Sequence, residues 1–323
     1  MEMIDRVYGK EEIKESVLID LINSNVVQRL KGISQLGMPD EYYHKKGYSR
    51  YEHSIGVLIL LRKLNADLTE QIAGLLHDVS HTAFSHVVDW VLGDPTKEDY
   101  QDNHFSEVFF NSNIPKILDK YGFDSSKISN IESFSLLERR APNLCVDRID
   151  YTLRELEFLG KSEIVKRILN DLTTKNGRVV FQGFRVAEDF ANEYMNLQNE
   201  HWAGNEARAR YYILASVLKK GLENEIINVN DFMRTDNEVI QLLKETNNDY
   251  ILNGLSLLKN SLKVLEDEKG IELKKKFRYI NPEVLIKNRI VPLTEISFDY
   301  RNFLKKTEKN SKNYKKVNII GFY

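Results

Sequence analysis

The stretch Leu75-Leu76-His77-Asp78-Val79-Ser80-His81-Thr82-Ala83-Phe84-Ser85-His86 decides how this sequence is interpreted. It joins a histidine to an aspartate at positions 77 and 78, and two further histidines follow at positions 81 and 86. Imidazole and carboxylate groups together suit a divalent ion such as Mn, Fe, Ni, Zn or Mg. A lone His-Asp pair is more often structural, because buried polar side chains usually serve as hydrogen-bond partners. The stretch therefore predicts a metal site only in combination with ligands elsewhere.

His53 is the first candidate for such a ligand. Five of the seven histidines lie at positions 53, 77, 81, 86 and 104, so they are clustered along the chain. Residues 50–64 show the apolar periodicity of a helix, on which His53 shares a stripe with Val57, Leu60 and Leu64. A histidine on a buried stripe needs a polar partner or an ion.

The His-Asp pair is itself predicted to lie on a helix. That helix is capped at Asp67, and its apolar stripe includes Ile72, Leu75, Leu76 and Val79. Because helical side chains lean toward the N-terminus, the small residues at 73 and 74 leave room for an ion or a neighbouring helix. A further helix is expected from Ala83 to Gly93, followed by a polar loop over 94–103.

Two aspartates follow on a helix predicted over 143–159. Asp147 and Asp150 lie about one turn apart, on the same face as Tyr151 and Arg154. Periodicity alone favours a solvated polar face for these residues, and a carboxylate supply for a metal is the alternative.

The composition is typical of a globular, mainly helical protein. Of the 323 residues, 42% are hydrophobic and 29% charged, with only 6 prolines. The net charge of −2 provides no global attraction for a polyanion such as DNA. The single cysteine, Cys145, excludes an intrachain disulfide, and no thiolate zinc cluster is apparent. With neither a signal-peptide pattern nor an apolar stretch of spanning length, we expect a cytoplasmic protein with no membrane partner.

The second half of the chain carries fewer chemical signals. Residues 176–185 have the glycine-punctuated pattern of a hairpin, and long helices are predicted over 188–221 and 230–268. Residues 301–323 contain seven Lys or Arg and one Glu, a balance of +6, and end in a strand-like segment over 317–323. Such a basic run is usually a solvated surface, with binding of an anion or a partner as the alternative.

Three segments together resemble the HD-superfamily phosphohydrolases, in particular the deoxynucleoside triphosphate triphosphohydrolases, including the animal enzyme that joins a sterile alpha motif to an HD domain. They are Arg50-Tyr51-Glu52-His53-Ser54-Ile55-Gly56-Val57, the stretch quoted first, and Val146-Asp147-Arg148-Ile149-Asp150-Tyr151. Val7-Tyr8-Gly9 and residues 28–37 are similar to that group's N-terminal motifs. The resemblance implies a mainly α fold, with an HD domain over 1–225, a motif-bearing core over 5–160 and a small α+β appendage over 226–323.

The resemblance also implies a ligand set and catalytic residues. His53, His77, Asp78 and Asp147 would bind one divalent metal ion of unknown identity, and water activated there would attack phosphorus. His81 and His86 match positions along the phosphate path, and His104 matches the position of the proton donor. The family usually has an acid directly after that last histidine, whereas this sequence has Phe105.

Substrate-binding positions are implied in the same way. Arg50 matches a phosphate contact, Gln35 a residue near the sugar, and Tyr151 and Glu155 residues near the nucleoside. Arg148 stands where the family often has lysine and joins this set. The helix over 188–221 is expected to bring further arginines and tyrosines to the phosphates, from Arg208, Arg210, Tyr211 and Tyr212.

The expected function is metal-dependent hydrolysis of a nucleotide, with conversion of a dNTP to a deoxynucleoside and triphosphate as the first candidate. A second hypothesis keeps the metal site but takes a monophosphate, a cyclic dinucleotide or an alarmone as substrate. A third is a regulatory module that uses the HD fold to bind nucleic acid through the basic tail. A homo-oligomer is compatible with all three.

Overall fold

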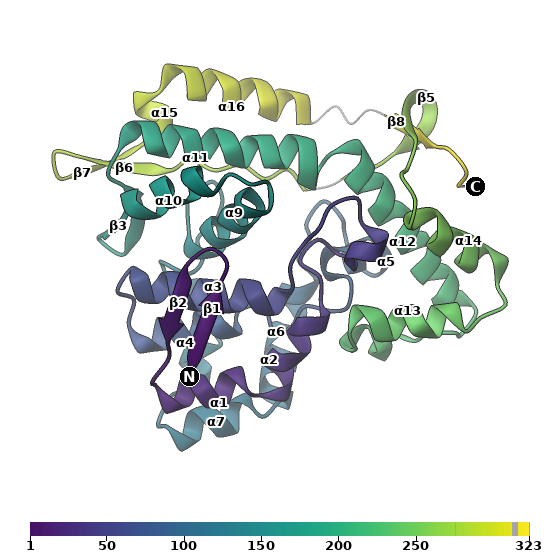
Figure 1. The fold of residues 1–323 in the computed structure, drawn as a ribbon, viewed down its shortest axis with the longest axis horizontal. Coiled ribbons are helices and arrows are strands. Elements are labelled where there is room, and N and C mark those ends of the chain that lie inside the picture. The colour runs from purple at the N-terminus through teal and green to yellow at the C-terminus, as the bar shows by residue number, and fades with distance from the viewer. Residues whose placement is uncertain (275, 312–315, 323) are drawn as a thin grey trace.

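The computed structural model describes residues 1–274, 276–311 and 316–322, and the protein is mainly helical with small sheets (Figure 1). A hairpin of β1 (Glu2–Asp5) and β2 (Gly9–Glu12) opens the chain. The helices of the first half follow: α1 Ser16–Ile22, α2 Asn25–Arg29, α3 Arg50–Lys63, α4 Leu68–Leu76, α5 Val88–Val91, α6 Tyr100–Asn111, α7 Ile114–Lys120, α8 Ser125–Ile128 and α9 Val146–Phe158.

The second half alternates helices with short strands. Its elements are α10 Ser162–Asp171, β3 Leu172–Lys175, β4 Arg178–Phe181, α11 Phe184–Asn196, a π-helix over Leu197–Trp202, α12 Asn205–Glu223, α13 Asp236–Lys244, α14 Asp249–Leu258, β5 Val264–Glu272, β6 Glu283–Ile286, β7 Arg289–Pro292, α15 Leu293–Ile296, α16 Phe298–Ser311 and β8 Lys316–Ile319. The four-stranded sheet has the order β3-β4-β6-β7, so strands from before and after the long helices share one sheet.

Helix α3 lies at the centre of the core because its neighbours approach it closely. Ser49 and Glu52 form a capping box that starts the helix. A Cβ on Gly74 of α4 would lie 2.3 Å from Leu61 of α3, and a Cβ on Gly56 of α3 would lie 1.8 Å from the guanidinium of Arg154 on α9. These glycines let α4 and α9 pack against α3, and buried apolar side chains from Tyr8 to Ile319 form one continuous core.

The segment after α4 differs from the predicted helices. Helix α4 ends at Leu76, so His77 and Asp78 follow the helix instead of lying within it. The helix expected from Ala83 is also wrong: Phe84 and Ser85 have positive φ angles of 65° and 47°, and α5 begins only at Val88. Contacts distant in sequence hold this shape, because the amide of Ala83 donates to the carbonyl of Phe232 and that of Phe84 donates to Asp236. Helix α6 begins inside the expected loop, at Tyr100.

The long helices predicted in the second half are divided. The one over 188–221 is interrupted by the π-helix and by Ala203-Gly204 before α12 starts. The one over 230–268 is wrong in its last part, where Val264–Glu272 is a strand paired with β8. Pairing between such distant segments leaves no periodic signal in either one.

The hairpin expected over 176–185 is present as β3 and β4 over 172–181. Of the basic tail, Phe298–Ser311 forms α16 and Lys316–Ile319 forms β8, while residues 312–315 and 323 lie outside the described residues. Among the described helices, none combines the length and apolarity needed to cross a membrane.

Candidate metal centre

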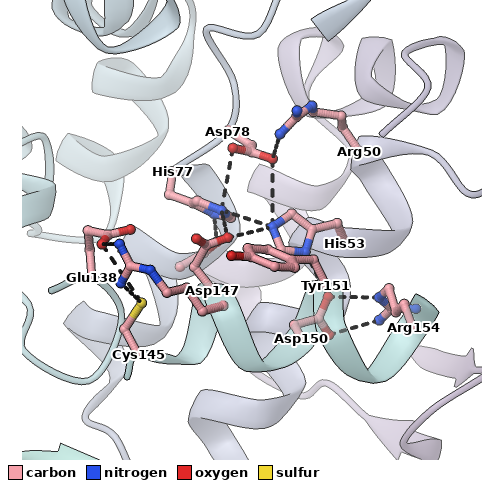
Figure 2. Close-up of polar contacts among 12 residues, drawn as sticks. Arg50, His53, His77, Asp78, Glu138, Cys145, Asp147, Asp150, Tyr151 and Arg154 are labelled. Atoms are coloured by element: carbon pink, nitrogen blue, oxygen red, sulfur yellow. Dashed lines mark hydrogen bonds and ion pairs between the residues drawn. The ribbon is translucent and has the colours of Figure 1, made fainter. Parts of the chain in front are cut away.

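Three side chains that are distant in sequence bring ligand atoms to one point (Figure 2). Nε2 of His53 lies 2.9 Å from Oδ1 of Asp147 and 3.3 Å from Nε2 of His77. Nε2 of His77 lies 3.6 Å from the same oxygen of Asp147. The three residues come from the buried helix α3, the end of α4 and the first turn of α9. Two imidazole nitrogens and a carboxylate facing one another form a donor set that a divalent cation can occupy.

Asp78 borders this group and is held by an arginine. Its carboxylate lies 3.4 Å from Nε2 of His77 and 3.8 Å from Nε2 of His53. Nη1 of Arg50 donates to Oδ2 of Asp78 at 2.7 Å. Burial works against the charged carboxylate, but Arg50 and His77 hold the pKa of Asp78 well below its usual range. Asp78 is therefore an anion that faces the cluster formed by His53, His77 and Asp147.

The outer nitrogens of both histidines are also held in place. Nδ1 of His77 lies 2.7 Å from the carbonyl of Gly74, one turn earlier. Nδ1 of His53 lies 2.7 Å from Oδ2 of Asp150. Because a backbone carbonyl only accepts and a carboxylate favours N–H, these contacts assign protons to Nδ1 and leave both Nε2 atoms as ligands.

Asp150 is the centre of a buried network, so the solvated-face interpretation of the α9 aspartates is wrong for this residue. Its side chain is fully buried and accepts from Tyr8 at 2.7 Å and from Nε of Arg154 at 2.8 Å. Arg154 reaches onward to Asp5 at 2.7 Å. The N-terminal hairpin is thereby linked to His53 through one carboxylate (Figure 2 shows Asp150 and Arg154).

The electrostatics of the cluster fit a bound cation. Burial opposes charge on His53, but hydrogen bonds with Asp147 and Asp150 outweigh it and raise the pKa of His53 to about 9. Burial likewise opposes charge on Asp147, yet its contacts with His53 and His77 hold the pKa of Asp147 far below its usual range. The surroundings thus favour positive charge where the donor atoms converge, and a divalent ion supplies that charge without a proton.

Of the other predicted catalytic histidines, His81 and His86 lie beside the cluster. Nε2 of His81 lies 3.3 Å from Oδ1 of Asp78, and its ring is 5.1 Å from that of His86. Burial and the nearby charge of Arg50 lower the pKa of His81 to about 4, so this ring is neutral at pH 7. Nδ1 of His86 lies 3.3 Å from Asp89.

His104 is not in contact with the donor atoms. Its Nδ1 donates to the carbonyl of Tyr100 at 2.7 Å, and its ring stacks on the Tyr100 ring at 4.2 Å. Phe105 points into the core. Within the described part of the chain, no hydrogen bond or ion pair joins His104 to the histidine and aspartate cluster.

The predicted substrate residues divide into two groups. The Tyr151 ring lies 6.3 Å from that of His53, whereas Glu155 contacts His201 at 3.3 Å. Oε1 of Gln35 is buried without a hydrogen-bond partner among the described residues. Arg50 bonds Asp78 and Ser85. Arg148 instead bonds the carbonyls of residues 139 and 143 and pairs with Glu138, which shapes the loop before α9.

The arginines and tyrosines of α12 have mainly structural contacts. Arg210 donates to the carbonyls of Tyr42, Leu258 and Asn260, and Tyr211 donates to the carbonyl of Leu36. Arg208 donates to the carbonyl of Leu273. These bonds tie α12 to the surrounding loops, which is a sufficient reason for their burial.

Residues 273–274 and 276–281, between β5 and β6, form a segment with basic residues that the motifs did not indicate. The amide of Lys276 donates to the carbonyl of Pro95 at 3.2 Å, and that of Asn281 donates to the carbonyl of Pro142 at 2.7 Å. Arg278 forms an ion pair with the buried Glu98. The segment is thus fastened to the loop before α6 and to the loop before α9. Helix α9 itself carries Asp147.

The positive charge of Arg278 acts on Tyr151 and Tyr194, and that of Lys276 acts on Asp102. Burial raises the pKa of Tyr194 to about 12, against a hydrogen bond with Tyr151 and the positive charge of Arg278. The Lys276 side chain is exposed, and partial desolvation together with the charges of Arg278 and Arg148 lowers its pKa. The only signal in the sequence was four basic residues between positions 274 and 278, without the periodicity of a helix or strand.

These features agree with comparisons to known proteins: the chain belongs to the HD-domain family of metal-dependent phosphohydrolases and is a hydrolase. The HD-domain model matches residues 50–154, which span all four candidate ligands.

Relatives extend the match over most of the chain. It is 39% identical to the protein YdhJ of Bacillus subtilis, over 92% of both chains. It is 32% identical to the metal-dependent phosphohydrolase cns2 of Cordyceps militaris, over 87% of this chain and 84% of that one. A deoxynucleoside triphosphate triphosphohydrolase SAMHD1 homolog of Dictyostelium discoideum is 27% identical over 50% of this chain and 37% of its own length.

Proposed function

We propose that this hydrolase acts on nucleotides, with a deoxynucleoside triphosphate as its first candidate substrate and triphosphate as the product. The observation that carries the proposal is the convergence of His53, His77 and Asp147 beside Asp78, with the Tyr151 ring adjoining. The similarity to the Dictyostelium triphosphohydrolase homolog supports the choice of substrate.

His53, His77, Asp78 and Asp147 would hold one divalent ion. When bound, this ion supplies Lewis-acid polarisation of a phosphoryl oxygen and activates a water molecule for attack on phosphorus. Asp150 and the carbonyl of Gly74 keep the two imidazoles oriented. The ligand geometry therefore does not have to be assembled when the substrate arrives.

The phosphates would approach on the side of Arg50 and His81. The buried guanidinium of Arg50 lies against Asp78, and neutral His81 offers a hydrogen-bond donor or acceptor beside it. Lys276, on the segment fastened to Pro95, adds a cation for the outer phosphates. Hydrolysis at the phosphate nearest the sugar also requires a proton for the leaving oxygen. His104, with Nδ1 committed to Tyr100, would present Nε2 for this transfer.

The test combines metal analysis with a substrate panel. We expect the purified protein to hold about one equivalent of divalent metal and to release triphosphate from a dNTP. His77→Ala with Asp78→Ala should abolish both, whereas Asp119→Ala on the exposed face of α7 should change neither. Release of orthophosphate or pyrophosphate would move the substrate to the other nucleotides considered. Wild-type metal content and turnover in the double variant would overturn the proposed site.

A further inference from the structure

Three polar side chains near Tyr151 have hydrogen-bonding atoms without partners. Gln198 and His201 belong to the π-helix and are 1% and 2% exposed, and the ring of His44 lies 5.9 Å from that of His201. Oε1 of Gln198, both ring nitrogens of His201 and Nδ1 of His44 make no hydrogen bond within the described residues. We refer to these three residues as the polar cluster.

Leaving such atoms unpaired is costly. A buried polar group without a partner destabilises a protein, so unpaired groups in native proteins usually bind water or a ligand. The π-helix points the same way, because this rare conformation is frequent at functional sites. The unpaired atoms of Gln198 and His44, with a His201 ring that has no hydrogen bond and meets only the carboxylate of Glu155, indicate a site that a bound molecule completes.

The polar cluster adjoins the predicted nucleoside residues. Nε2 of His201 lies 3.3 Å from Oε2 of Glu155, in a geometry outside that of a hydrogen bond. The neighbouring Trp202 ring lies 5.2 Å from that of Tyr151, which in turn lies 6.3 Å from that of His53. A continuous series of contacts thus leads from the histidine and aspartate cluster to the unpaired atoms.

The chemistry of the polar cluster favours a neutral ligand over a phosphate. Burial lowers the pKa of His44 to about 4, so this ring is neutral at pH 7. The nearby carboxylate of Glu155 repels an anion. A neutral imidazole supplies one donor and one acceptor, and an amide supplies both as well. Such a set matches the adjacent donors and acceptors on the edge of a nucleobase.

We propose that His44, Gln198 and His201 bind the hydrogen-bonding edge of the nucleobase and make this hydrolase base-selective. The inference rests on the proposed function, since it places the nucleoside at Tyr151 and Glu155. A buried polar site rejects a base whose donors and acceptors do not match, because the protein atoms then stay unpaired.

The test compares four deoxynucleotides that differ only in base. We expect wild-type kcat/KM to differ by at least about tenfold between the best and worst base. His201→Phe and Gln198→Met remove the unpaired atoms at similar volume, and should reduce this ratio to within about threefold. Gln198→Met should melt at or above the wild-type temperature, because Oε1 of Gln198 makes no hydrogen bond within the described residues. His201→Phe also removes the contact with the buried carboxylate of Glu155, so it should melt below the wild type.

A matched control is Gln71→Met in helix α4. Gln71 is also buried, but its amide donates to the carbonyl of Ala66 and accepts from Arg62. This variant should lower the melting temperature and leave the base ratio unchanged. A wild-type ratio within about twofold across the bases, an unchanged ratio in both cluster variants, or a change only in ribose preference would overturn the proposal.

Binding of unphosphorylated deoxynucleosides separates this inference from the proposed function. The four nucleosides are dialysed against Mn²⁺-loaded wild type and His201→Phe. If no nucleotide is hydrolysed, the proposed function fails, yet selective nucleoside binding that is lost in His201→Phe still supports the polar cluster. Absent or unselective binding overturns the inference even when nucleotides are hydrolysed.

Discussion

Replacing Asp150 tests whether the buried network behind His53 sets metal affinity. Asp150 accepts from Tyr8 and Arg154 and lies 2.7 Å from Nδ1 of His53. Loss of a carboxylate behind a ligating histidine typically weakens metal binding 10–100-fold. We expect about tenfold for Asp150→Asn, which keeps the shape, and about a hundredfold for Asp150→Ala. Both changes leave Asp5 as the only carboxylate partner of Arg154, and should cost about 3 kcal/mol of unfolding free energy.

The matched control is Asp5→Asn. Arg154 then loses the negative charge of Asp5 but keeps that of Asp150. His53 also keeps its carboxylate partner. This variant should lower the unfolding free energy by about 3 kcal/mol as well. Its metal affinity should stay within about threefold of the wild type.

Two measurements decide the matter. Competition with a chelator gives the metal dissociation constant, and urea denaturation of the metal-free protein gives the unfolding free energy. Wild-type affinity in Asp150→Ala would refute the orienting role of Asp150. Equal weakening in Asp5→Asn would show that affinity follows stability alone.

Three further predictions follow from single contacts. Lys276→Ala should raise KM for a triphosphate about tenfold, with little effect on KM for a monophosphate. Lys274 is a surface lysine paired with Glu272, and Lys274→Ala should change neither KM value. Equal KM values for both variants would remove Lys276 from the phosphate site. Gly56→Ala should lower the unfolding free energy measured by chemical denaturation by about 3 kcal/mol, because the added Cβ would lie 1.8 Å from Arg154 and 2.1 Å from Asp150. Near-wild-type stability would contradict this packing. In the metal-free protein His53 has its pKa raised from 6.5 to about 9, so its stabilising contribution is complete below pH 6.5 and is lost as the pH rises toward 9. Urea titrations of wild type and His53→Gln across that range should differ accordingly, and parallel curves would exclude the effect.

The sequence alone was sufficient for features that depend on local order. Helix α3 was predicted over 50–64 and runs over Arg50–Lys63, because a cap and an apolar stripe act within a few residues. Family resemblance selected His53, His77, Asp78 and Asp147, and the structure brings these residues together, while their roles as ligands stay a prediction.

Tertiary structure alone decided what depends on distant partners. Periodicity placed Asp150 and Arg154 on a solvated face, but Tyr8 and Asp5 of the N-terminal hairpin bury them. Bonds to Phe232 and Asp236 replaced a predicted helix after Ala83, and pairing with β8 made residues 264–272 a strand. The segment with Lys276 has no periodic pattern, and the helical periodicity over 188–221 did not indicate the π-helix that holds Gln198 and His201. A local sequence pattern reflects only interactions between residues that are near in sequence. Contacts between distant segments form only when the chain folds, so no local pattern indicates them.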